Sequence, residues 1–164
     1  MTINYTIGDA TQPTGTGQKL ITHICNDRGG WGSGFVLALN RHSLTPRQAY
    51  RRWYMNGSDG SIPFALGEAQ IVNYTDGVWV ANMIAQHGIR HDPNDPPAVR
   101  YDALRSTLTK VADYAHRGIS VPSVHMPRIG CGLGGGSWDE IEPIINDTLI
   151  ARGIPVTVYD LEEP

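Results

Sequence analysis

Short apolar runs bounded by turn residues alternate along the chain with longer segments whose apolar residues recur at helical spacing. The short runs predict strands, because Gly, Pro, Asn and Asp residues close them on either side. The predicted strands cover residues 4–7, 19–24, 68–74 and 78–84, a stretch within 121–129, and residues 156–159.

Helical periodicity is clearest in a segment that is expected to end near Gly118. One face of that segment carries Tyr101, Leu104, Leu108, Val111 and Ala115. A second amphipathic helix is predicted near the C-terminus, where one face carries Trp138, Ile141, Ile145 and Leu149. A short helix is also expected over residues 35–40.

Capping residues mark the expected starts of two helices. Thr45 and Gln48 have the spacing of a capping box, and the helix that they open should run to about Asn56. Ser137 and Glu140 have the same spacing at the start of the C-terminal helix.

The order of these elements predicts the fold class. Strands that alternate with helices are typical of α/β proteins, and they predict a three-layer α/β/α sandwich. Asp76-Gly77 lies between two predicted strands and is a strong hairpin signal, so the central sheet is expected to be mixed. No repeat or linker interrupts the pattern, and residues 1–164 are expected to form one domain.

Composition and charge narrow the function classes. The net charge of −3 argues against a broad surface for nucleic acid. The first residues lack the pattern of a signal peptide, and no apolar run is long enough to span a bilayer, so we expect a cytoplasmic protein with no membrane partner. Two cysteines are too few for a zinc cage, and the histidines show no metal-ligand spacing. No metal or other cofactor is therefore expected.

Two glycine-rich segments of the chain are the candidate ligand-binding loops. Residues 29–34 and 130–136 hold most of two glycine-rich loops, and each loop lies between a predicted strand and a predicted helix. Glycine lets consecutive N–H groups turn toward a phosphate, and ligands of open α/β sheets bind at the carboxyl ends of strands. Two such loops predict a ligand with two phosphates. Tight turns without a ligand are the simpler alternative.

The second loop also fits a different class of protein. Gly130, Gly132 and Gly135 match the dinucleotide fingerprint, and Asp160 ends the following strand. A nicotinamide-dependent oxidoreductase is therefore an alternative. It is disfavoured because the fingerprint normally opens a two-halved fold, whereas here only one strand follows it, and because the first glycine-rich loop stays unexplained.

Three longer segments allow a more specific interpretation. Residues 23–27, 80–89 and 126–133 have the sequences HICND, VANMIAQHGI and MPRIGCGL. With these segments the chain resembles the macrodomain family over nearly its whole length, from Gly8 to Leu161. It is most similar to the branch that contains terminal ADP-ribose protein glycohydrolase. The resemblance implies an ADP-ribose ligand.

The resemblance also implies how the adenine is bound. Asp9, next to Ala10, is expected to accept a hydrogen bond from the adenine amino group, as carboxylates do when they read bases. Asp160 and Leu161 are expected to lie near the same ring. The alternative role for Asp9 is an Asx turn after Gly8.

The glycine-rich loops are implied to surround the distal ribose and the diphosphate. Contacts from the first loop are expected from Cys25, Asn26, Gly30, Trp31, Gly32, Ser33 and Gly34. Contacts from the second are expected from Pro127, Ile129, Gly130, Cys131, Gly132, Leu133 and Gly134. Trp31 either covers the ribose or packs onto residues 85–99. Both cysteines are expected to pack as small apolar side chains, because no partner base is identifiable from their spacing.

The chain departs from the glycohydrolase at two catalytic positions. Where that enzyme has an attacking lysine and an assisting aspartate, this chain has Gln86 and Gly134, so the lysine mechanism is not transferred. Instead, Gln86 or Asn26 is expected to hold a water against the ligand phosphate. Asp27 or His87 is a candidate general acid or base. The structural alternatives are that Asp27 caps the turn and that His87 bonds loop backbone.

These expectations combine into two hypotheses about function. The first is a hydrolase that removes ADP-ribose from acidic side chains of modified proteins, or that processes small esters or the 1″-phosphate of ADP-ribose. The second is a non-catalytic reader of ADP-ribose. The expected partner is ADP-ribose or an ADP-ribosylated protein, and nucleic acid is expected only as an ADP-ribosylated substrate.

Overall fold

The computed structural model describes residues 1–161, and a six-stranded sheet in the order β1-β8-β7-β2-β6-β5 forms its centre. The strands are β1 (Asn4–Ile7), β2 (Lys19–Asn26), β5 (Ala69–Thr75), β6 (Val78–Gln86), β7 (Ser123–Met126) and β8 (Val156–Asp160). All neighbours pair in parallel except β5, which runs antiparallel to β6. The mixed sheet and the hairpin at Asp76-Gly77 are therefore confirmed.

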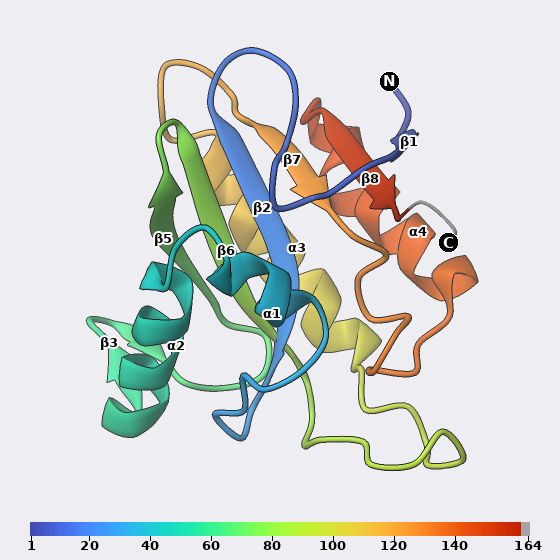
Figure 1. Cartoon of the computed structure of the whole chain (residues 1–164). Helices are drawn as coiled ribbons and strands as arrows, with labels where there is room; N and C mark the ends of the chain where they lie inside the picture. Colours follow the sequence, from blue (N-terminus) through green and yellow to red (C-terminus); the bar gives the residue numbers. More distant parts are fainter. Residues whose placement is uncertain (162–164) are drawn as a thin grey trace.

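Helices cover both faces of the sheet and confirm the three predicted layers (Figure 1). Helices α1 (Phe35–Asn40) and α2 (Thr45–Asn56) cover one face, and α3 (Tyr101–Ala115) and α4 (Trp138–Thr148) cover the other. Each face has its own apolar core. Tyr50 and Trp53 of α2 are fully buried on one side, and Leu104 of α3 and Ile141 of α4 on the other. Burial of a large apolar side chain contributes roughly 1.5–3 kcal/mol.

Two strands run further than the sequence pattern indicated. β2 continues to Asn26 and β6 to Gln86, two residues past the expected ends. The register shifts between Cys25 and Asn26, so that Cys25 pairs with Ile84 and Asn26 pairs with Gln86. Ala85 is the extra residue of this β-bulge. Bulges re-aim side chains near functional sites, and here the bulge brings two polar residues together at the strand ends.

The predicted capping boxes are wrong, although each helix begins within one residue of its expected start. Thr45 is already the first helical residue, and the N-cap position belongs to Leu44. The Thr45 N–H donates instead to Ser43 Oγ, at 3.2 Å. Ser137 does occupy an N-cap position, but its side chain makes no capping hydrogen bond.

Three short elements were not predicted from sequence. They are β3 (Ser58–Asp59), β4 (Ile62–Pro63) and the 3₁₀ turn η1 (Ile150–Arg152). Each is too short to show a periodicity of its own. Within residues 1–161, none of the helices combines the length and the apolar character needed to traverse a bilayer.

A row of polar side chains crosses the sheet beneath α2. His23, Asn82 and Gln70 occupy paired positions on β2, β6 and β5, and all three are buried. His23 Nε2 lies 2.6 Å from Asn82 Oδ1, and Asn82 Nδ2 donates to Gln70 Oε1 at 3.1 Å. Asn82 and Gln70 also donate to the α2 carbonyls of Pro46 and Ala49. Because buried polar groups are costly unless they are bonded, this row fixes α2 against the sheet.

Burial lowers the pKa of His23 to about 4, and the hydrogen bond to Asn82 opposes only part of that effect. The unfolded chain therefore binds more protons than the folded chain between roughly pH 4 and pH 6.5, so stability rises with pH in this window. Between pH 7 and pH 5, His23 alone should cost about 2 kcal/mol of stability.

Replacing this histidine should make stability less dependent on pH. The amide of His23→Gln can still donate to Asn82, but it does not titrate. We expect its free energy of unfolding in urea to fall less between pH 7 and pH 5 than that of the wild type. The control His42→Gln alters an exposed histidine and should keep the wild-type fall. Equal falls in all three proteins would contradict a neutral, buried His23.

Candidate functional site

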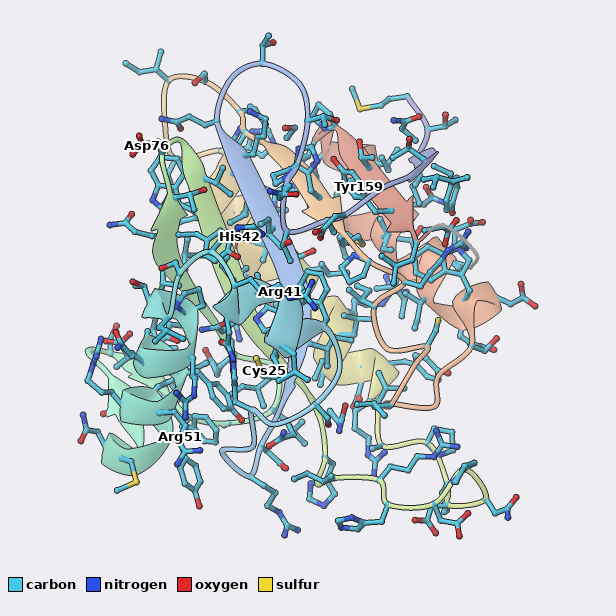
Figure 2. The ribbon with its side chains drawn as sticks, viewed as in Figure 1. Cys25, Arg41, His42, Arg51, Asp76 and Tyr159 are labelled. Atoms are coloured by element: carbon cyan, nitrogen blue, oxygen red, sulfur yellow. The ribbon has the colours of Figure 1, made fainter. Side chains whose placement is uncertain are left out.

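The segments that follow β2, β6 and β7 gather at the carboxyl ends of these parallel strands (Figure 1). Between them lies a cavity of about 950 Å³. Cys25, near the end of β2, and Tyr159, on β8, belong to two of its walls, and Asp76 lies at the other end of the sheet (Figure 2). Most residues predicted to bind a ligand line this cavity: Cys25, Asn26, Gly30, Trp31, Gly32, Ser33, Gly34, Gln86, Pro127, Ile129, Gly130, Gly132, Leu133, Gly134, Asp160 and Leu161.

Other residues of the wall were missed by the sequence analysis. They are His23, Ile24, Phe35, Val36, Ile89, Arg90, Arg128 and Tyr159. Arg128 lies inside the segment MPRIGCGL, so its position in that motif was a usable signal. Arg90 lies in the loop after β6, and no pattern in the sequence marks it.

The side chain of Asn26 builds the first glycine-rich loop. Its Oδ1 accepts hydrogen bonds from the N–H groups of Arg28 and Gly30, at 2.9 and 3.1 Å, and its Nδ2 donates to Gly30 O at 3.0 Å. The hydroxyl of Tyr50, from α2, donates to the main-chain carbonyl of Asn26. The Asn26 amide is therefore used inside the loop, which leaves it less able to hold a water for catalysis.

The second glycine-rich loop is folded tightly against the chain before α3. Gly136 N–H donates to Gly130 O at 2.7 Å, and Gly134 O accepts from the N–H groups of residues 98 and 99. Gly130 has φ +76°, and a Cβ there would lie 2.9 Å from Ile141 Cδ1. Gly132 differs, because a Cβ on it would meet nothing within 4 Å. The loop thus turns an open backbone surface toward the cavity.

Trp31 is buried and is not an exposed cover over the ribose, which was one of its two expected roles. It is only 6% exposed, and its Nε1 donates to Asn40 Oδ1 at 2.9 Å. Its ring packs edge-on against His23 and tilted against Tyr50, with centroids 5.2 and 5.4 Å away. These contacts belong to the core beneath α1 and α2. They favour a structural role for Trp31 at the cavity wall.

Gln86 is the polar side chain best placed to act on a bound ligand. It is the last residue of β6, and its Nε2 donates to Gly88 O at 3.2 Å. Its Oε1 lies 3.4 Å from the position where a Cβ on Gly134 would be. The same Cβ would lie 3.0 Å from Gly130 O, so a side chain at position 134 would stand between that carbonyl and the Gln86 amide.

Asp27 and His87 lie together beside the cavity and not in its wall. Asp27 Oδ2 is 2.7 Å from His87 Nδ1, and Asp27 Oδ1 accepts from Gly88 N–H at 2.7 Å. Partial burial raises the pKa of Asp27, but the hydrogen bonds from Gly88 and His87 outweigh it and hold the pKa below its ordinary value. Asp27 is thus an ionised carboxylate that ties the first loop to the loop after β6. Neither structural alternative is found as expected: Asp27 bonds the neighbouring loop instead of capping its own turn, and His87 bonds the Asp27 carboxylate instead of loop backbone.

Asp9 and Ala10, which follow β1, also lie outside the wall of the cavity. Asp9 Oδ1 accepts from the N–H and the hydroxyl of Thr11, at 2.9 and 2.7 Å. This is the Asx-type turn that was the alternative to adenine binding. Ala10 is buried. The role of Asp9 in adenine binding stays a prediction.

Asp160 is paired with an arginine that the sequence analysis did not assign. Arg128 Nε and Nη2 donate to the two oxygens of Asp160, at 2.8 and 2.9 Å. These hydrogen bonds hold the pKa of Asp160 below its ordinary value. The guanidinium also lies over the rings of Tyr5 and Trp138, 4.8 and 4.9 Å from their centroids. Arg128 therefore joins the end of β8 to the start of α4 along one edge of the cavity.

Both cysteines pack as predicted. Cys25 is buried, and burial raises the pKa of its thiol. Burial also raises the pKa of Cys131, which packs against the core under α3 and α4 and lies outside the described wall. Neither residue is a thiolate at neutral pH, so neither is poised for nucleophilic attack.

The fold and the cavity define a class of protein: an α/β/α sandwich that leaves an open, glycine-lined site at the carboxyl ends of its parallel strands. No family model matches the chain. It is 49% identical to a macrodomain protein from Streptomyces coelicolor, with a TM-score of 0.82 over 96% of this chain and 98% of that one. The chain belongs to the macrodomain family.

Two curated relatives extend the comparison. The chromodomain-helicase-DNA-binding protein 1-like of Mus musculus is 32% identical over 96% of this chain, which spans only 17% of that relative's length. The ADP-ribose glycohydrolase OARD1 of Bos taurus is 30% identical over 58% of this chain and 57% of its own length. The similarity to the glycohydrolase branch is thus found by sequence comparison as well as in the motifs.

Removing the Asn26 side chain should loosen the first loop. Asn26→Ala deletes three hydrogen bonds to the loop backbone, and we expect the free energy of unfolding to fall by about 2 kcal/mol. The control Ser33→Ala alters an exposed residue within the same loop and should stay within about 0.5 kcal/mol of the wild type. Urea unfolding measures both. A loss for Asn26→Ala no larger than that for Ser33→Ala would show that the Asn26 amide does not hold the loop.

Proposed function

We propose that this macrodomain binds ADP-ribose and hydrolyses it from acidic side chains of modified proteins. The observation that carries the proposal is the position of Gln86, whose amide ends β6 in the cavity wall beside the second glycine-rich loop. The similarity to a relative named as an ADP-ribose glycohydrolase supports the same activity.

The cavity suits a ligand with a diphosphate at its centre. Gly32 and Gly132 line the cavity from the two loops, and a Cβ on either would meet nothing within 4 Å. A phosphate can therefore approach main-chain N–H groups from both sides, and such groups bind anions without lysine. The volume of about 950 Å³ lies at the upper end of the usual range for sites that hold ligands of this size.

The chemistry that the site must supply is modest. In the substrate, the anomeric carbon of the distal ribose carries a glutamate or aspartate carboxylate. A water held between Gln86 Oε1 and a ligand phosphate oxygen attacks that carbon. The bond from carbon to the carboxylate oxygen breaks with its electron pair, and the water proton passes to the phosphate or to solvent. Because a carboxylic acid has a pKa near 4.3, its carboxylate leaves without being protonated. The site needs no general acid, and positioning of the water lowers the barrier.

A non-catalytic reader of ADP-ribose is the second candidate. The composition of the cavity wall favours it. Among residues 1–161, Asp160 is the one carboxylate that lines the cavity. Arg128 already pairs with both oxygens of that carboxylate. His23, the one histidine of the wall, is buried, and its lowered pKa makes it a weak base.

Removing the Gln86 amide tests the role of Gln86 in hydrolysis. We expect Gln86→Ala to release ADP-ribose from a glutamate-linked substrate roughly 100-fold more slowly than the wild type. Its affinity for ADP-ribose should stay within about threefold, because the backbone of the loops holds the diphosphate. Gln48→Ala, which alters an exposed glutamine on α2, is the matched control and should keep full activity.

Binding and release measured on the wild-type protein distinguish a hydrolase from a reader. Tight ADP-ribose binding without release from the glutamate ester would contradict hydrolysis and support the reader. Release at equal rates by the wild type and Gln86→Ala would contradict the role given to Gln86.

Filling the cavity from the second loop should abolish binding without unfolding the protein. A glutamate at position 132 has room for its Cβ, and its carboxylate repels a diphosphate. We expect Gly132→Glu to weaken ADP-ribose binding more than about 100-fold in calorimetry, with an unchanged urea midpoint. Gly118→Glu, at an exposed position outside the cavity wall, should bind normally. Normal binding by Gly132→Glu would remove this loop from the site.

A further inference from the structure

A smaller cavity of about 390 Å³ opens next to the first one, on the loop between β6 and α3. Ile89 and Arg90 line both cavities. Gln86 contacts this loop directly, because its Nε2 donates to Gly88 O. A chain that carries ADP-ribose and leaves the large cavity beside Gln86 therefore meets the smaller cavity next.

Positive charge is concentrated in the smaller cavity. Arg28, Arg90 and Arg100 line it, together with a single carboxylate, Asp95. The guanidinium groups of Arg90 and Arg100 donate to main-chain carbonyls of residues 93–99. Neither arginine takes part in an ion pair within the described part of the chain. Their charge is held in place but is not neutralised.

Arg28 adds a third cation at the mouth of this cavity. Its side chain is 65% exposed, and its Nε lies 3.9 Å from Asp27 Oδ1. Asp27 already accepts shorter hydrogen bonds from His87 and Gly88, so Arg28 is only loosely engaged. A local excess of positive charge on a chain whose net charge is −3 attracts an anionic partner.

We propose that this arginine-lined cavity binds acidic side chains that flank the ADP-ribosylated residue of a substrate protein. The inference rests on the function proposed above, since it describes where the carrier of ADP-ribose lies. Guanidinium groups fixed by carbonyls are pre-organised to pair with carboxylates.

The lining favours a polypeptide over a nucleic acid. Ile89, Pro96 and Pro97 give the cavity an apolar side against which a peptide backbone can lie. Its wall, as far as residues 1–161 describe it, holds no Trp, Tyr or Phe on which bases could stack. The negative net charge of the chain also opposes a long polyphosphate.

Binding of two peptides of equal length tests the proposal. Each carries ADP-ribose through a non-hydrolysable linkage; one has Asp and Glu on both sides of the modified residue, and the other has Asn and Gln. We expect the wild type to bind the acidic peptide about tenfold more tightly. Arg28→Glu should lose this preference, while Arg117→Glu, at an exposed position after α3, should keep it. Free ADP-ribose should bind all three proteins equally, because Arg28 lies outside the wall of the large cavity.

The outcomes separate the two proposals. Equal affinities of the wild type for both peptides, with ADP-ribose binding intact, would overturn the inference and leave the proposed function standing. Failure to bind free ADP-ribose would overturn the proposed function itself. Tighter binding of an ADP-ribosylated oligonucleotide than of either peptide, lost in Arg28→Glu, would assign the cavity to nucleic acid and overturn the peptide proposal.

Discussion

The pairing of Asn26 with Gln86, at the carboxyl ends of two parallel strands, is the contact on which the site depends. Asp27 N–H donates to Gln86 O at 3.0 Å, and the bulge at Ala85 brings the two residues into register. From this point the Asn26 side chain folds the first glycine-rich loop, while Gln86 lines the cavity. One irregularity in the sheet thus places both the first glycine-rich loop and the Gln86 amide, to which the proposed hydrolysis assigns the attacking water.

Helix α2 stabilises the pairing of Asn26 with Gln86 through contacts in the core. The polar row of His23, Asn82 and Gln70 bonds α2 to the sheet, and Tyr50 of α2 bonds the main chain of Asn26. Because the row is buried and nearly fully bonded, α2 has little freedom to slide. The position of the first loop is therefore set by interactions within the protein core. The second loop is fixed separately, through the hydrogen bonds between Gly134 and the segment before α3.

Much of the fold follows from local pattern. The strands at residues 78–84 and 156–159 and the hairpin at Asp76-Gly77 are found within two residues of their predicted bounds, because periodicity and turn residues are local properties. The helix that begins at Tyr101 ends at Ala115, three residues before its predicted end near Gly118. The capping boxes were wrong because a cap depends on the backbone conformation of one residue, and sequence spacing does not determine it. The bulge at Ala85 was also missed, since a register shift is a property of two strands.

The part of the site that main-chain atoms form could be predicted from the sequence. Glycines at strand ends mark the cradle, and most residues named from the motifs line the cavity. Side-chain partnerships were not predictable. Nothing local indicates that Arg128 pairs with Asp160, that Trp31 turns into the core, or that Asp27 faces His87 instead of the cavity. Each of these depends on residues that are distant in sequence.

Hydrolysis of a glutamate-linked substrate in water enriched in oxygen-18 tests the central claim most directly. If Gln86 positions water for attack on the ribose carbon, the glutamate keeps both of its original oxygens, and mass spectrometry of the released peptide will find it unlabelled. Label in the glutamate carboxylate would mean that water attacks the ester carbonyl, and it would contradict this account of the site.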